Sequence, residues 1–173
     1  GKKDFSFKKR KELLYAQRPY AVVVGCSDSR VPPELIFDQG LGDIFVIRVA
    51  GNVLDPVSLG SIEYAVEHLK TPLIVLLGHT RCGAVHATIH FNCKEEGNLS
   101  AIVEKIMPAV LEAKKVAKSE EDLLNKAIEE NVKLQKEFML RNSRIIREYV
   151  KENKIHIVMA IYDMETGEIK PIK

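Results

Sequence analysis

Residues 73–77 read LIVLL, a run of apolar residues with nothing polar for either face of the strand that it predicts. Side chains of a strand alternate between the two faces of a sheet, so this strand must be covered on both sides. Strands of that kind belong to parallel sheets that are connected by helices. Residues 20–25 and 44–49 also predict strands, and helical patterns separate the three. The chain therefore predicts an α/β fold with a mainly parallel central sheet flanked by helices.

The ends of the helices and the last strands can also be predicted. Asp55 as N-cap and Pro56 at the first helical position start a helix that Thr71-Pro72 stops. A helical region follows from residue 99 to about 152, and Pro108 is expected to divide or kink it. Residues 155–172 predict a strand, a glycine-containing turn and a second strand. This hairpin adds one antiparallel strand at the C-terminus.

The chain is expected to form one domain preceded by a short arm. Residues 4–16 are basic and mildly helical. We predict an N-terminal helical arm over residues 1–18 and a single α/β domain over residues 19–173. A chain of 173 residues is long enough for one such domain with a real core.

Composition excludes several functional classes. A net charge of +2 argues against nucleic acid as the main partner. No apolar run approaches the roughly 20 residues that span a bilayer, and no signal-peptide pattern is present, so no membrane association is expected. We expect a cytoplasmic location, and leave the periplasm or secretion open because the first residue is Gly1 rather than Met, which points to a removed N-terminal extension. Three cysteines at uneven spacing indicate metal binding or catalysis rather than a disulfide scaffold.

Two groups of reactive side chains follow two of the predicted strands. Cys26, Asp28 and Arg30 come directly after the first strand, and His79 and Cys82 follow the third. Ligands of an open parallel sheet gather outside the carboxyl ends of its strands. If the first and third strands are neighbours, two thiolates and one imidazole meet at that edge. A Cys₂His set is typical of catalytic zinc, whose fourth position is left for water.

Other interpretations of these residues remain open. Cys26 alone could be a small buried apolar residue. A closed structural zinc site would take Cys93 or His86 as its fourth ligand. A nucleophilic thiolate of the phosphatase or sulfurtransferase type is disfavoured, because Asp28 would put negative charge where an anion should sit. His86 and His90 are candidates for a proton shuttle or are ordinary surface histidines.

The sequence resembles the β-class carbonic anhydrases from about residue 15 to the C-terminus. The resemblance is carried by CSDSRVPPELIFDQGLGDIFVIRVAGN, by GSIEYAVEHLKTPLIVLLGHTRCGAV and by ENVKLQKEF with the C-terminal hairpin. C-x-D-x-R followed some fifty residues later by H-x-x-C is the signature of that family. The resemblance implies a zinc enzyme that interconverts carbon dioxide and bicarbonate. It also implies a homodimer, or a multiple of dimers, with the active cleft at the subunit interface.

The family's functional residues can be carried over to positions in this chain. The resemblance assigns one Zn²⁺ per chain to Cys26, His79 and Cys82, and a catalytic dyad to Asp28 and Arg30. The substrate-binding residues that it implies, some of them contributed by the partner subunit, are Gln17, Phe45, Tyr64 and Gly83.

Departures from the family pattern point to a subtype. Thr80 replaces a tyrosine and the chain has no tryptophan, which resembles the plant-type, open-site members that lack an allosteric bicarbonate site. Ala50 and Ala84 also depart from common family residues, so the resemblance does not define the shape of the cleft at these positions.

The spacing of Asp28 and Arg30 suggests how a zinc-bound hydroxide would attack carbon dioxide. An ionised Asp28 can only accept a hydrogen bond, so it would take the proton of the hydroxide and turn a lone pair to the substrate. Arg30 would keep Asp28 ionised through a charge-assisted pair. There are two alternative functions. One is a hydrolase of carbon disulfide or carbonyl sulfide that uses the same ligands, and the other is a non-catalytic zinc-stabilised binding module.

Overall fold

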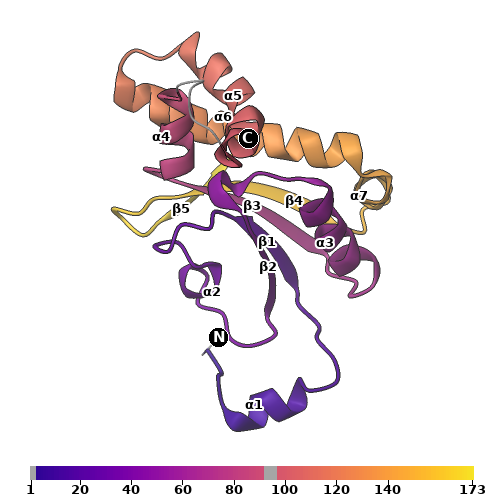
Figure 1. The fold of residues 1–173 in the computed structure, drawn as a ribbon. Helices are drawn as coiled ribbons and strands as arrows, with labels where there is room; N and C mark the ends of the chain where they lie inside the picture. The colour runs from indigo at the N-terminus through magenta and orange to yellow at the C-terminus, as the bar shows by residue number, and fades with distance from the viewer. Residues whose placement is uncertain (1–2, 92–96) are drawn as a thin grey trace.

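A central sheet organises the computed structural model, which describes residues 3–91 and 97–173 (Figure 1). Within those ranges it has five strands: β1 (Ala21–Gly25), β2 (Ile44–Arg48), β3 (Leu73–His79), β4 (His156–Tyr162) and β5 (Ile169–Ile172). Their order across the sheet is β2-β1-β3-β4-β5, and only the β4–β5 pair is antiparallel. The expected α/β fold with a mainly parallel sheet and a C-terminal hairpin strand is therefore confirmed.

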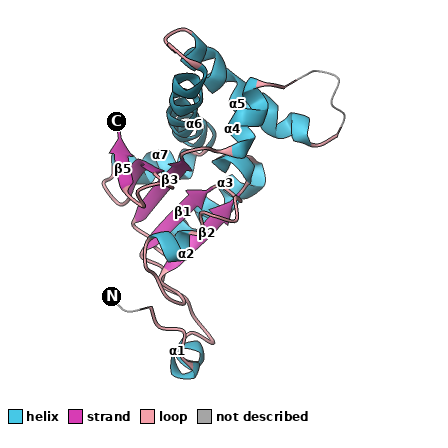
Figure 2. Ribbon diagram, turned by 90° about the vertical axis from the view of Figure 1, so that its left-hand side faces the viewer, coloured by secondary structure: helices cyan, strands magenta, loops and turns pink. Residues whose placement is uncertain are grey.

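Helices cover the sheet and extend beyond one of its ends. The helical segments are α1 (Phe7–Glu12), α2 (Pro33–Ile36), the 3₁₀ turn η1 (Ala50–Asn52), α3 (Pro56–Glu67), α4 (Gly83–Ile89), α5 (Leu99–Lys114), α6 (Glu120–Asn142) and α7 (Arg144–Lys151). Figures 1 and 2 both show α4, α5 and α6 gathered together and α1 far from them at the opposite end. No helix in the described ranges is long and apolar enough to cross a membrane.

The main core lies between the sheet and the larger helices. Val22 and Val24 of β1 and Ile74 and Leu76 of β3 face this core, together with Ile106 of α5. The intervening strand residues form a smaller cluster on the other face: Val23, Val75, Leu77 and Ala160, with Ile36 of α2 against them. The central strands are thus covered on both faces, as their uninterrupted apolar sequence requires.

The strands begin and end within two residues of the expectation, and the expected division of the helical region at Pro108 is not found. β3 continues beyond residue 77 to His79, because its last residues still pair with β4 as far as Tyr162. α5 runs through Pro108 without division. Proline removes one helical hydrogen bond, but Ile106 and Val110 are fully buried on either side of it and hold the helix together.

Gly78 allows the end of β3 to pack closely against its neighbours. A Cβ atom at this position would lie 2.7 Å from Val132 Cγ2 of α6 and 2.8 Å from Ile161 Cδ1 of β4. Such distances are too short for real carbon–carbon contacts, so a larger residue would push the strand away from the helix. The glycine therefore fixes the position of the next residue, His79, at the sheet edge.

α1 lies on the surface at the start of the chain. Its Phe7 is 64% exposed, and the segment before it is tied to the body through the Lys3–Asp38 ion pair and a hydrogen bond from Leu41 N–H to Asp4 O. The expected end of this arm at residue 18 stays a prediction.

Candidate metal centre

The structure brings Cys26, His79 and Cys82 together at one sheet edge. β1 and β3 are parallel neighbours, with Val24 opposite Leu76, so their carboxyl ends meet. Cys26 follows β1, His79 ends β3, and Cys82 is the N-cap residue of α4. One ligand atom from each of these three side chains lies within 4.8 Å of the other two, and all three residues are buried.

His79 is oriented as a metal ligand would be. Its Nδ1 lies 2.9 Å from the carbonyl oxygen of Thr80, so the Nδ1–H donates to that carbonyl and Nε2 keeps its lone pair. Nε2 is buried and has no hydrogen-bond partner among the described residues. Buried polar atoms are rarely left unpaired, and an unpaired acceptor beside two thiols fits a cation.

The surroundings of the two thiols shift their pKa values in opposite directions. Cys26 Sγ accepts hydrogen bonds from Gly51 N–H at 3.2 Å and from Asp28 N–H at 3.4 Å. The Cys82 thiol also donates to it, which lowers the pKa of Cys26, whereas the same shared proton and burial raise the pKa of Cys82. Thiols lose their protons when a thiophilic divalent ion binds such a pair.

Asp28 and Arg30 form a forked ion pair beside the thiols. Arg30 Nε donates to Asp28 Oδ1 at 2.9 Å, its guanidinium NH₂ group donates to Oδ2 at 2.7 Å, and its backbone N–H donates to Oδ1 at 3.0 Å. These bonds hold the pKa of Asp28 well below its usual range. The Asp28 side chain is 14% exposed, against 56% for Arg30, and its Oδ2 lies 4.0 Å from His79 Nε2.

Arg48 holds the loop that carries these groups, and the sequence analysis missed it. Its Nε donates to the carbonyl of Cys26 at 2.8 Å and its guanidinium NH₂ group donates to the carbonyl of Asp28 at 2.6 Å. Arg48 is the last residue of β2 and pairs with Gly25, so its side chain starts at the same sheet edge. The available signal was a charged residue at the end of an otherwise apolar strand.

A buried amide chain supports the site from α6. Asn131 Nδ2 donates to the carbonyl of Gly51 at 2.8 Å, Gln135 Nε2 donates to Asn131 Oδ1 at 3.0 Å, and Leu54 N–H donates to Gln135 Oε1 at 2.9 Å. Gly51 has φ of +67°, and a Cβ there would lie 2.6 Å from Ile106 Cδ1. The turn that donates to Cys26 therefore requires glycine. The signal for the amides was their spacing of four residues on one helix.

Of the expected substrate-binding residues, one lies at the cluster and three do not. Gly83 is the first residue of α4, directly after Cys82. Phe45 pairs with Val22, four residues before Cys26, which places it about 13 Å back along the strands. Tyr64 packs on Phe45 with ring centroids 6.2 Å apart, and Gln17 is exposed ahead of β1.

Of the two proposed fourth ligands of a closed site, the structure describes only His86, which does not lie at the cluster. His86 lies beside His90 and Glu120 in a separate group, because it projects from α4 a full turn beyond Cys82. His86 as the fourth ligand of a structural site is therefore wrong. Cys93 lies outside the described residues.

Comparisons with known proteins identify the family. The family model described as "Carbonic anhydrase" matches residues 21–169. The carbonic anhydrase of Mycolicibacterium smegmatis is 53% identical over 119 residues, which are 66% of this chain and 57% of that protein. Carbonic anhydrase 2 of Mycobacterium tuberculosis is 41% identical over 162 residues, covering 91% of this chain and 76% of that protein.

Solved structures agree with this result. A tetrameric β-carbonic anhydrase of Sordaria macrospora has a TM-score of 0.83 at 29% identity, over 94% of this chain and 84% of that one. The Coccomyxa β-carbonic anhydrase in complex with acetazolamide has a TM-score of 0.85 at 27% identity, over 94% of this chain and 75% of that one. The matched residues contain both sheet-edge motifs, and the chain belongs to the β-carbonic anhydrase family of enzymes.

Proposed function

We propose that this chain catalyses the reversible hydration of carbon dioxide to bicarbonate and a proton. The observation that carries the proposal is the buried Cys26–His79–Cys82 cluster with the unpartnered His79 Nε2, next to an ionised carboxylate. These three side chains would hold one Zn²⁺ per chain. When bound there, zinc supplies a Lewis acid that makes water nucleophilic near neutral pH. The names of the relatives support hydration over the alternative functions.

Asp28 has the charge and position to orient the attacking oxygen. As a carboxylate it only accepts hydrogen bonds, so it takes the O–H of the nucleophile and leaves a lone pair facing carbon dioxide. Arg30 occupies both Asp28 oxygens and keeps the carboxylate turned toward it rather than toward the ligand atoms. This arrangement supports an open-site subtype.

We further propose a homo-oligomer in which two copies complete each cleft. Gln17, Phe45 and Tyr64 lie away from the cluster of their own chain, so a substrate site that uses them needs the residues of a second copy. Apolar side chains on and near the arm are available for such contacts: Phe5, Phe7, Leu14 and Tyr15 are 49–94% exposed. The Sordaria macrospora relative is tetrameric.

Zinc content and activity test the main proposal together. After dialysis against a weak chelator, we expect one zinc per chain and rapid hydration of carbon dioxide in stopped flow. We expect the bound zinc and the hydration activity to be lost in each of three variants: Cys26→Ser, His79→Ala and Cys82→Ser. A strong chelator should abolish hydration by the unchanged chain. Cys93→Ser is the matched control and should keep both. Zinc loss in Cys93→Ser would support a closed structural site, and turnover of carbonyl sulfide alone would support the hydrolase.

Substitutions of the ion pair test its two roles. Asp28→Asn can donate as well as accept, so we expect full zinc content and a hydration rate lower by about two orders of magnitude. Arg30→Ala frees the carboxylate, which already lies near His79, to turn onto the metal. That variant should be zinc-loaded and inactive, with a carboxylate visible among the ligands in a crystal structure.

The double variant is the control for the ion pair. Asp28→Asn with Arg30→Ala has no carboxylate to close the site, so it should be no less active than Arg30→Ala alone. If both single variants instead lose zinc, the pair has a structural role only.

A hybrid dimer tests the shared cleft. The Cys26→Ser chain and the Gln17→Ala chain are co-expressed with different tags and purified as a mixed dimer. If each cleft uses residues of both chains, one cleft of this dimer contains only wild-type residues. We expect about half of the wild-type rate per dimer, well above that of either parent. A hybrid no faster than half the Gln17→Ala parent would mean that each cleft is built within one chain.

Arg48 is proposed as a positioning residue for the ligand loop. Arg48→Met removes both carbonyl contacts, and we expect zinc affinity to fall about 10- to 100-fold, as for other residues that orient ligands. Arg48→Lys keeps one donor and should recover part of the loss. The readout is the rate of zinc transfer to a chelator, and unchanged transfer in Arg48→Met would contradict the role.

A further inference from the structure

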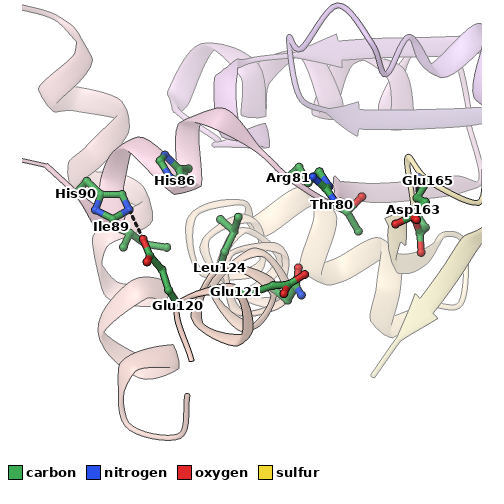
Figure 3. A pocket seen from close by; sticks show the side chains of 11 residues that line it. Thr80, Arg81, His86, Ile89, His90, Glu120, Glu121, Leu124, Asp163 and Glu165 are labelled. Carbon is green, nitrogen blue, oxygen red and sulfur yellow. Dashed lines mark hydrogen bonds and ion pairs between the residues drawn. The ribbon is translucent and has the colours of Figure 1, made fainter. Parts of the chain in front are cut away.

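A second group of metal-ligating side chains lies outside the proposed catalytic centre. It consists of His86 and His90 from α4 and its C-cap, and Glu120 at the start of α6. One ligand atom from each lies within 4.8 Å of the other two. Figure 3 shows the two imidazoles side by side, with Glu120 reaching to His90 from the neighbouring helix. Their side chains are exposed, so water has access to the remaining coordination positions.

The local fold holds these three residues in place. His86 and His90 are four residues apart, which puts them on one face of α4, with ring centroids 4.5 Å apart. Ser119 caps α6 by accepting from Asp122 N–H, and this fixes the helix start at Glu120. Ile89 of α4 and Leu124 of α6 line the same cavity, of about 580 Å³. The ligands thus come from two packed elements rather than from one mobile segment.

The distances suit a single ion. His90 Nε2 lies 3.1 Å from Glu120 Oε1. Two atoms at that separation can both lie about 2.0–2.1 Å from one zinc ion, the usual length of its bonds to imidazole and carboxylate. His86 offers the third ligand atom, within 4.8 Å of the other two.

The surrounding charges also favour a cation. Glu121, Asp163 and Glu165 line the same cavity, and of these Asp163 is paired with Lys170 at 3.1 Å. Arg81 is the one cationic side chain that lines the cavity in the part of the chain described. The positive end of the α6 dipole repels a cation in this cavity, but the negative charges of Glu120 and Glu121 in the first turn of α6 offset that repulsion.

We propose that His86, His90 and Glu120 form a second site for a divalent transition-metal ion, with zinc as the fitting ion. Two imidazoles and a carboxylate are borderline ligands that bind late first-row metals, and water completes the coordination. The site shares no residue with the catalytic centre, so it does not depend on the proposed function. A bound ion would link α4, whose first turn follows Cys82, to the start of α6.

Zinc titration of the holoprotein tests this site. Protein that already holds its first zinc, dialysed against a weak chelator, is titrated with Zn²⁺ by calorimetry at slightly alkaline pH. We expect one further saturable equivalent per chain and a higher melting temperature in its presence. His90→Ala and Glu120→Gln should each weaken this second binding at least about tenfold while the first zinc is retained. His68→Ala and His156→Ala, which change exposed histidines elsewhere, are the matched controls and should bind as the unchanged chain does.

Co²⁺ added to the zinc-loaded protein identifies the donor atoms. Nitrogen and oxygen ligands give visible cobalt bands without the near-ultraviolet charge-transfer band of thiolate ligands. His79→Ala should lose the first zinc and keep the second site, which separates failure of this proposal from failure of the catalytic one. If no second equivalent binds, if His90→Ala binds it unchanged, or if a thiolate band appears, the proposal is wrong and His90 and Glu120 form only an ion pair.

Discussion

Parallel pairing between β1 and β3 brings two chain segments more than fifty residues apart to a single edge of the sheet, and the cluster depends on it. Cys26 leaves the end of β1 and His79 forms the end of β3, so the spacing between their side chains is set by the strand ladder. β2 pairs with the other side of β1 and delivers Arg48 to the same edge. Gly78 then lets β3 approach α6 closely enough for His79 to be buried.

Burying an imidazole and two thiols has a cost that the rest of the molecule offsets. An unpaired buried polar atom such as His79 Nε2 destabilises the fold unless a partner is supplied. In the proposed holoenzyme a cation supplies it, so part of the free energy of metal binding contributes to folding. The amide chain from Asn131 and Gln135 also offsets the cost of burial, because it holds the turn whose N–H donates to Cys26.

Local patterns predicted most of the fold and the reactive residues of the cluster. Apolar runs predict buried strands without knowledge of their partners, and a capping aspartate such as Asp55 marks a helix start from its immediate neighbours. Arg48 and Asn131 were missed because their partners are 20 to 80 residues away along the chain. Such contacts depend on strand register and on how α6 crosses the sheet. Pro108 does not divide α5, because buried neighbours, which the sequence shows only indirectly, compensate for a lost hydrogen bond.

One chain alone positions the metal-ligating cluster, whereas the proposed substrate cleft requires a second chain. The cluster, the Asp28–Arg30 pair and Arg48 are all positioned by contacts within the chain. Phe45 and Tyr64 pack together on a single protomer, yet they lie several residues back from the sheet edge where the thiols meet. The proposed ligands therefore need only the fold, whereas the proposed cleft needs assembly. Together, the two proposals predict that a single chain can take up its metal before it associates, and that the partner then completes the cleft around a centre that is already formed.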